Sequence, residues 1–198
     1  MKKIIVLGGT FNPVHKGHIE LAVKAHEQLQ LPVLVMPSGD PSSYKPDSEL
    51  VEAIHRVHML ELATAEYNYM TVSKMEVQRP GKTYTADTLD ILTKEYELIY
   101  FIIGADSFFK LPHWYRPEHI CANCHLLVAG RNQYTEEEML QQKELLQQKF
   151  SAQVDFLDTP DMPYSSTSIR QCIKNHVDIS QMVPVDVVNY IYKNHLYE

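Results

Sequence analysis

The sequence is poor in the features that mark several classes of protein. It holds only three cysteines in 198 residues, too few for the disulfide framework of a small secreted domain. No apolar run approaches the length of a membrane span, and the start Met1-Lys2-Lys3 leads into an apolar run too short for a signal-peptide core. We therefore expect a cytoplasmic protein with no membrane partner.

Positive charge is also scarce. The chain has 18 Lys and Arg against 25 Asp and Glu, a formal net charge of −7, so we expect no nucleic-acid partner. An acidic protein that handles phosphates must gather its positive charge locally. The basic candidates near the motifs described below are His15, Lys16, His18, Lys45, Arg56, Arg131 and Arg170. For Lys16 we prefer a simple solvated role.

The remaining composition is ordinary for a globular protein, with 44% hydrophobic and 22% charged residues and no low-complexity tract. A length of 198 residues fits one compact domain. No linker or repeat interrupts the chain. We predict a single domain over residues 1–198, with 165–198 as its C-terminal helical subregion.

Short apolar runs alternate with segments of helical periodicity along the chain. This alternation predicts an α/β fold, a Rossmann-like parallel sheet with helices on both faces and a small C-terminal helical part. The expected strands are Ile4–Leu7, Val33–Met36, Leu98–Ile103 and Leu126–Ala129, with weaker candidates near Thr71-Val72 and Val154–Leu157. Helical spacing joins Ile19, Ala22, Val23 and Leu29; Leu89, Leu92 and Tyr96; Met139, Leu146 and Phe150; and Ile169, Cys172, Ile173 and His176. Pro184 suits the first turn of a final helix.

The segment from Gly8 to His18, Gly-Gly-Thr-Phe-Asn-Pro-Val-His-Lys-Gly-His, is the most informative part of the chain. It follows the first expected strand, and parallel sheets bind their ligands beyond the carboxyl ends of the strands. It matches neither the G-x-G-x-x-G of dinucleotide oxidoreductases nor a P-loop. Hydride transfer and ordinary NTP hydrolysis are therefore disfavoured together.

The residue types of this segment suit a nucleotide. Gly8 and Gly9 allow backbone amides to approach it closely. We expect His15 in a turn and His18 at the start of a helix beginning near Gly17, where free amides favour an anion. Two imidazoles aimed at one phosphate could donate hydrogen bonds to oxygens that gain charge in the transition state.

A different chemistry is suggested by Cys121-Ala122-Asn123-Cys124-His125, which matches the attachment pattern of a c-type haem. Haem attachment needs export, for which the sequence shows no signal, and a zinc site would need a further ligand pair. We prefer a short helix or loop that leads into the buried strand around Leu127. A haem or redox protein remains the minor alternative.

The motif of the first turn resembles a known signature. Gly8-Thr10-Phe11-Pro13-His15-Gly17-His18 resembles the G-x-F-x-P-x-H-x-G-H of the nucleotidylyltransferase superfamily, and Ser165 to Arg170 resembles its I-S-S-T-x-I-R. The segment Arg79–Leu89 is similar to the R-x-G-x-S-Y-T-x-D-T-L of bacterial nicotinate-nucleotide adenylyltransferases, and Phe101 to Trp114 to their I-G-x-D…L-x-x-W. The ending from Val183 to Tyr197 matches as well, so the resemblance spans nearly the whole chain.

This resemblance implies an in-line attack by the phosphate of nicotinic acid mononucleotide on the α-phosphorus of ATP, which forms deamido-NAD and releases pyrophosphate. The nucleophile is already an anion, so catalysis reduces to positioning and charge stabilisation. The implied partners are ATP and nicotinic acid mononucleotide, and a homo-oligomer stays open. Mg²⁺ would be carried by the ATP phosphates and water, and no protein metal ligand is predicted.

The resemblance also implies roles for individual residues. His15 and His18 are the expected catalytic residues, in contact with the ATP phosphates. The expected ATP-binding residues are Gly8, Gly9, Thr10, Phe11, Gly104, Asp106, Ser166, Thr167 and Arg170. The expected residues for the second substrate are Lys45, Tyr84, Thr85, Trp114 and Arg131.

Selectivity for the acid form of the mononucleotide has a physical account. We interpret Thr85 as the first cap of the helix that carries Leu89, where backbone amides favour a nicotinate carboxylate over a neutral carboxamide. Trp114, the only tryptophan, would stack on the pyridine ring. The alternative for Trp114 is a mere packing role.

Two departures from the family pattern stand out. Ser42-Ser43-Tyr44-Lys45 replaces the usual Pro-Pro-His-Lys, and Asn132 follows Arg131 where the family has proline. Three competing functions stay open at this point: adenylyl transfer to nicotinamide mononucleotide, transfer to phosphopantetheine, and a non-catalytic nucleotide sensor.

Overall fold

The computed structural model describes residues 2–41, 49–130, 134–159, 163 and 165–198. In this part of the chain six parallel strands form one sheet in the order β4-β2-β1-β6-β7-β8. The strands are β1 (Lys3–Gly9), β2 (Val33–Pro37), β4 (Met70–Val72), β6 (Leu98–Gly104), β7 (His125–Ala129) and β8 (Gln153–Phe156). Two short strands, β3 (Asp40–Pro41) and β5 (Lys82–Thr83), pair separately.

This strand order defines the doubly wound fold. The chain runs from β1 outward to one edge, returns to the centre with β6 and then runs to the other edge. The sequence prediction of a Rossmann-like parallel sheet is confirmed, as are all six predicted strands. The reversal of order falls between β1 and β6, and such a switch point is where open parallel sheets bind ligands.

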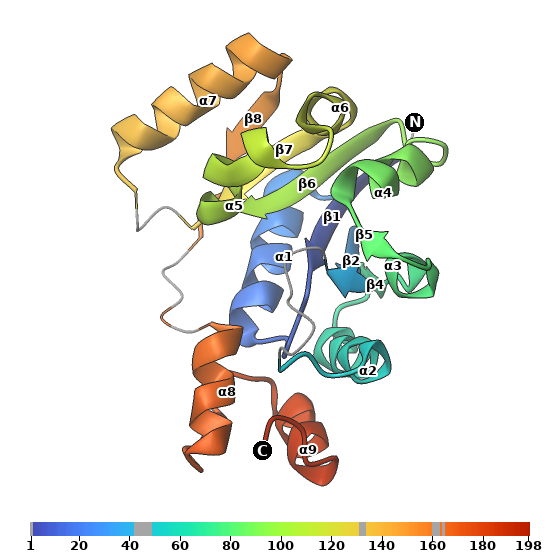
Figure 1. Ribbon diagram of the computed structural model, residues 1–198, viewed down its shortest axis with the longest axis vertical. Helices are drawn as coiled ribbons and strands as arrows, with labels where there is room; N and C mark the ends of the chain where they lie inside the picture. The colour runs from blue at the N-terminus through green and yellow to red at the C-terminus, as the bar shows by residue number, and fades with distance from the viewer. Residues whose placement is uncertain (1, 42–48, 131–133, 160–162, 164) are drawn as a thin grey trace.

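Helices cover both faces of the sheet (Figure 1). One face carries α1 (Lys16–Leu29), α2 (Ala53–Thr64), α8 (Ser166–Lys174) and α9 (Val185–Lys193). The other carries α4 (Thr85–Leu92), α5 (Ala105–Lys110), the 3-10 turn η1 (Leu111–His113), α6 (Pro117–Asn123) and α7 (Glu136–Phe150). The short helix α3 (Met75–Gln78) lies between β4 and β5 in the chain.

The alternation of side chains along β1 explains why both faces are covered. Ile5 and Leu7 are buried against α1 and the C-terminal helices, whereas Ile4 and Val6 are buried in the cluster with α4 and α6. Each fully buried aliphatic side chain contributes about 1.5–3 kcal/mol. A strand buried on both sides becomes a continuous apolar run, as the sequence shows.

The C-terminal helices share the core of the sheet. Ile169 and Ile173 of α8 and Val187 and Ile191 of α9 are fully or almost fully buried and belong to the cluster that contains Ile5. Figure 1 shows both helices at one end of the molecule, beyond α1 and α2. Their packing brings the end of the chain close to its first turn.

Helix ends differ from the prediction by small amounts. Tyr96 lies beyond α4, which ends at Leu92, and His176 lies beyond α8, where it takes the left-handed conformation (φ 54°) that stops the helix. Pro184 is the N-cap of α9 and not its first helical residue. Among the described residues, no helix is long and apolar enough to cross a membrane.

Gly39 is the glycine with the strictest requirement for space. A Cβ added there would lie 2.2 Å from the carbonyl oxygen of Glu76, which belongs to the backbone of α3. We expect Gly39→Ala to lower the free energy of unfolding by about 3 kcal/mol, because the backbone must move to relieve the overlap. Urea denaturation measures the change. Gly104→Ala is the control, since a Cβ there meets no atom within 4 Å. Equal stability of the two variants would contradict the prediction.

Candidate active site

The candidate site begins at the carboxyl ends of β1 and β6, the two strands at the switch point. Leu7 pairs with Ile102, so Gly9 and Gly104 end neighbouring strands at the same edge of the sheet. A Cβ on Gly9 would press against the Phe11 ring at 3.1 Å, whereas one on Gly104 would meet open space. The first glycine therefore allows close packing, and the second leaves room for a ligand.

The turn after β1 is buried. Phe11 is only 2% exposed and has a positive φ of 51°, and Asn12 is 1% exposed. The carbonyl oxygen of Thr10 accepts a hydrogen bond from the Arg56 guanidinium at 2.9 Å. The same buried arginine also donates to the carbonyl oxygens of Ser38 and Gly39. It also donates to the carbonyl oxygen of Val51. Arg56, a candidate for phosphate binding by its charge, thus holds three stretches of backbone together.

His15 and His18 are brought together at the start of α1. His15 is the N-cap, and its backbone N–H donates to Nδ1 of His18 at 3.2 Å. The two imidazole rings stack with their centroids 3.6 Å apart, and the Phe11 ring meets His18 edge-on at 4.9 Å. Because Nδ1 of His18 accepts a hydrogen bond, the proton of its neutral ring lies on Nε2.

Burial sets the charge of this pair. It lowers the pKa of His15 to about 4. It also lowers the pKa of His18 well below its ordinary value, and the neighbouring His15 lowers it further. Both rings are therefore neutral at pH 7. A neutral imidazole offers one N–H donor, which suits a site that must stabilise charge developing on a phosphate oxygen.

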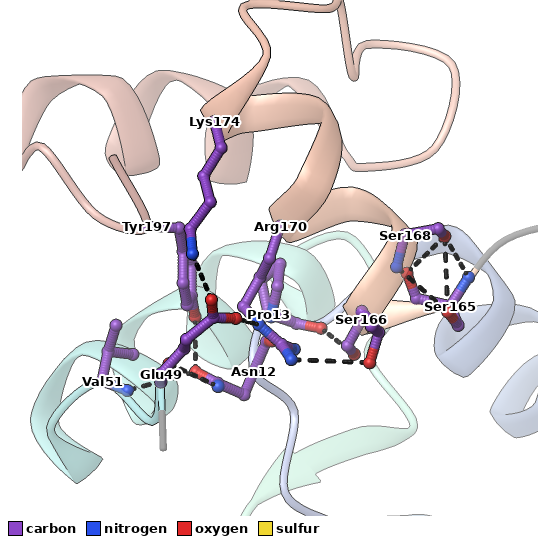
Figure 2. A network of polar contacts seen from close by, with 11 residues as sticks. Asn12, Pro13, Glu49, Val51, Ser165, Ser166, Ser168, Arg170, Lys174 and Tyr197 are labelled. Carbon is purple, nitrogen blue, oxygen red and sulfur yellow. Dashed lines mark hydrogen bonds and ion pairs between the residues drawn. The ribbon is translucent and has the colours of Figure 1, made fainter. Parts of the chain in front are cut away.

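The start of α8 lies against the same turn. Ser165 caps the helix by accepting from the backbone N–H of Ser168, and the Ser166 hydroxyl donates to the carbonyl oxygen of Pro13 at 2.8 Å. The two predicted motifs, at opposite ends of the sequence, are thus adjacent in space (Figure 2). Thr167, the next predicted residue, occupies the first turn of this helix.

Arg170 faces protein groups on all sides of its guanidinium. Nε donates to the Glu49 carboxylate at 2.9 Å, Nη1 to the carbonyl oxygen of Asn12 at 2.8 Å and Nη2 to the hydroxyl of Thr167 at 3.4 Å. Lys174 pairs with the same carboxylate (Figure 2). These contacts lower the pKa of Glu49, first through Lys174 and then through Arg170. Glu49 is thus the internal anion of this region, a role that no sequence pattern indicated.

Asp106 lies in the first turn of α5, next to Gly104 at the edge of the sheet. Its carboxylate accepts a hydrogen bond from the hydroxyl of Tyr134 at 3.0 Å, which raises the pKa of that tyrosine. No local sequence pattern points to Tyr134, because it lies 28 residues from Asp106.

The predicted residues for the second substrate lie near the start of α4. Tyr84 is the N-cap of this helix and Thr85 its first residue, so the assignment of Thr85 as the cap is wrong by one position. The reason is that the carbonyl oxygen of Tyr84 accepts from the backbone N–H of Thr88. The Tyr84 ring lies 4.8 Å from that of Tyr115, and Trp114 is half-buried against the hydrophobic cluster that includes α4.

A network of hydrogen-bonded polar side chains connects α4 to α3. The hydroxyl of Thr88 donates to the Glu76 carboxylate at 2.5 Å and accepts from Arg79 at 3.2 Å. Burial raises the pKa of Glu76, while the Thr88 hydrogen bond and the charge of Arg79 oppose that shift. These hydrogen bonds therefore hold α3 against α4, the helix that carries Thr85.

Two of the predicted residues for the second substrate fall on parts of the chain that the structure does not describe. Lys45, with the Ser42–Lys45 loop, and Arg131 lie outside the described residues. Lys16 is exposed and donates to the carbonyl oxygen of Ser180.

The two cysteines of the haem-like pattern lie in the core. Cys121 and Cys124 are 3% and 6% exposed, and burial raises the pKa of Cys121 to about 11 and that of Cys124 still further. They belong to α6 and its C-cap, directly before β7, so the predicted short helix leading into a buried strand is confirmed. No group of three or more His, Cys, Asp or Glu among the described residues is placed to hold a metal ion.

The low pKa of His15 predicts how stability depends on pH. The unfolded chain binds a proton on this residue near pH 6.5 and the folded chain only near pH 4, so the free energy of unfolding falls as the pH drops through that interval. We expect His15 to account for at most about 3 kcal/mol of this loss. Urea denaturation between pH 7.5 and 4.5 should show a shallower loss for His15→Gln than for the unsubstituted chain. Parallel curves would contradict the predicted shift.

Comparison with known proteins identifies the family of this chain. The cytidylyltransferase-like family model matches residues 6–172. A probable nicotinate-nucleotide adenylyltransferase of Lachnoclostridium phytofermentans is 43% identical over 200 residues, which cover 100% of both chains. A second relative with the same description, from a Synechococcus strain, is 37% identical and covers 99% of this chain and 97% of its own.

Solved structures share the fold. The Plasmodium falciparum nicotinic acid mononucleotide adenylyltransferase complexed with NaAD superposes with a TM-score of 0.77 at 20% identity, covering 100% of this chain and 98% of that chain. A structure from Vibrio parahaemolyticus, described as a putative nicotinate-nucleotide adenylyltransferase, gives a TM-score of 0.69 at 21% identity, covering 100% of this chain and 96% of that one. With a family model spanning most of its length and full-length relatives above 30% identity, the chain belongs to the cytidylyltransferase-like family and, within it, to the nicotinate-nucleotide adenylyltransferases.

Proposed function

We propose that this protein transfers the adenylyl group of ATP to nicotinic acid mononucleotide, forming deamido-NAD and pyrophosphate in NAD biosynthesis. The observation that carries the proposal is the stacked, neutral pair of His15 and His18 at the switch point of the sheet. The relatives with full-length matches bear the name of this activity.

The chemistry asks little of the protein beyond position and charge. The phosphate of the mononucleotide is already an anion and attacks the α-phosphorus of ATP in line, while pyrophosphate leaves. The Nε2–H of neutral His18 donates to an oxygen that gains charge as the bonds exchange. His15 stacks on that ring and adds a second imidazole beside the phosphates. No general base is required.

We place ATP along the carboxyl ends of β1 and β6. The adenylate is lined on one side by Gly8, Gly9, Thr10 and Phe11. We place its ribose next to Asp106, because the backbone at Gly104 leaves open space there. The β- and γ-phosphates lie at the start of α8, toward Ser166, Thr167 and Arg170. Glu49 already neutralises Arg170, so the triphosphate would exchange with that carboxylate.

The acceptor lies toward the start of α4. Backbone N–H groups after Tyr84, including that of Thr85, face a nicotinate carboxylate, which gains more from the helix N-terminus than a carboxamide does. Trp114 stacks on the pyridine ring. Lys45 and Arg131 complete the set of residues that we propose for the second substrate, with the mononucleotide phosphate as their ligand.

Magnesium enters this scheme with ATP. Mg²⁺ keeps several waters and binds phosphate oxygens, so we assign it to the substrate and to no group of side chains. We further propose that the chain acts as one domain, because its C-terminal helices and its sheet share a core. We propose that the protein acts in the cytoplasm, with ATP and the mononucleotide as its partners and with neither nucleic acid nor membrane involved.

One assay tests the proposed function. Purified protein is incubated with MgATP and, separately, nicotinic acid mononucleotide, nicotinamide mononucleotide or phosphopantetheine. Formation of deamido-NAD and pyrophosphate at the highest kcat/KM supports the proposal. Faster turnover of either other acceptor would replace it, and binding of ATP without pyrophosphate release from any of the three would make the protein a nucleotide sensor.

His18→Ala should lower kcat by about 10²–10³-fold with little change in KM, because the lost N–H acts on charge present mainly in the transition state. Steady-state kinetics and a thermal melt check the rate and the fold together. An unchanged kcat in a folded variant would remove the assigned role.

Trp114→Ala should raise the Michaelis constant for nicotinic acid mononucleotide by about tenfold, from lost stacking. The Michaelis constant for ATP should stay within about twofold, since we place the adenylate at the carboxyl ends of β1 and β6 and the pyridine ring toward the start of α4. Kinetics with each substrate varied in turn supply the comparison. Equal increases for both substrates would count against stacking.

A further inference from the structure

Asn12 is the residue that ties the first turn to the rest of the molecule. Its side-chain Oδ1 accepts from the Tyr197 hydroxyl at 2.9 Å and from the backbone N–H of Val51 at 3.3 Å. Its Nδ2 donates to the carbonyl oxygen of Glu49 at 2.9 Å, and its own carbonyl oxygen accepts from Arg170. Figure 2 shows these contacts converging on Asn12. The residue is 1% exposed.

Asn12 lies only three residues before His15. Pro13 and Val14 connect the two, and both are buried, while the carbonyl oxygen of Pro13 accepts from Ser166. The backbone N–H of His15 in turn fixes Nδ1 of His18. With so little free chain between them, a shift of Asn12 moves the N-cap of α1 and both imidazoles.

Of the residues named here that bond to Asn12, Tyr197 is the most distant in the sequence, at a separation of 185 residues. Its ring is packed in the core, at 8% exposure, with Leu196 beside it in the same cluster. Its backbone has a positive φ of 69°, a conformation that costs a non-glycine residue energy and persists only where surrounding contacts enforce it. The end of the chain is therefore held in a defined place, with its hydroxyl against Asn12.

We propose that Tyr197 is a positioning residue for adenylyl transfer. Its hydroxyl fixes Oδ1 of Asn12, and through Asn12 it holds the turn that orients His15 and His18 toward the α-phosphate. The inference rests on the proposed function for its catalytic consequence. It concerns the orientation of groups that act in the transition state, so it predicts an effect on kcat more than on the binding of either substrate.

The chain offers a matched comparison. The hydroxyl of Tyr190 also bonds to a side chain from a remote helix, Nδ1 of His55 at 2.9 Å, and so joins α9 to α2. Tyr190→Phe removes a hydroxyl and its hydrogen bond to His55, on the side of α9 that faces α2. Tyr197→Phe removes a hydroxyl and its hydrogen bond to Asn12. A purely structural role for Tyr197 would make the two variants alike.

The kinetic test compares both variants with the unsubstituted protein. Tyr197→Phe should lower kcat by about tenfold and leave both Michaelis constants within about twofold, as expected for misplaced catalytic groups. Tyr190→Phe should keep its kcat at a similar loss of melting temperature. In a His18→Ala background, Tyr197→Phe should add little, because the group that it positions is gone. An unchanged kcat, or a full multiplicative loss in the double variant, would overturn the proposal.

A second measurement needs no turnover. In protein labelled with ¹⁵N-histidine, NMR spectra report the tautomer and surroundings of each ring. Tyr197→Phe should shift the His15 and His18 signals, and Tyr190→Phe should leave them in place. If the protein forms no deamido-NAD, the proposed function fails and these spectra alone decide the positioning role. Unshifted His15 and His18 signals in Tyr197→Phe would refute it.

Discussion

The hydrogen bond from the backbone N–H of His15 to Nδ1 of His18 organises the first turn of α1. It determines which nitrogen of His18 carries the proton, and the stacked neighbour keeps the ring in place. Burial keeps both rings neutral, so the pair offers hydrogen-bond donors without adding positive charge. For a reaction between two anionic phosphates, donors already oriented avoid the cost of reorganisation at the moment of transfer.

Positive charge in this site is balanced by the protein itself. Arg170 and Lys174 share the Glu49 carboxylate, although the chain as a whole is acidic. Arg170 is 7% exposed, and a buried guanidinium without a partner would be costly. The proposed exchange of Glu49 for a triphosphate would keep that charge paired both before and after ATP binds. The same arginine also donates to the carbonyl oxygen of Asn12, so the proposed phosphate site and the turn that carries the imidazoles are physically connected.

The fold was largely predictable because its signals are local. A run such as Ile4–Leu7, apolar on both faces, indicates a strand covered on both sides, and the alternation with helical segments indicates parallel order. Helix ends were less accurate, since the start of α4 depends on which carbonyl oxygen accepts the first hydrogen bond. The short β3–β5 pair escaped prediction because two-residue strands leave no periodic pattern.

The sequence by itself determined the residue types of the site: glycines after a strand, two imidazoles three residues apart, and a serine-rich helix start followed by an arginine. Only the tertiary structure decided the partners of those residues. Glu49 against Arg170, Tyr134 against Asp106 and Tyr197 against Asn12 join segments 28 to 185 residues apart. Such pairs leave no mark on local periodicity, because they form only when the sheet and the C-terminal helices have packed around one core.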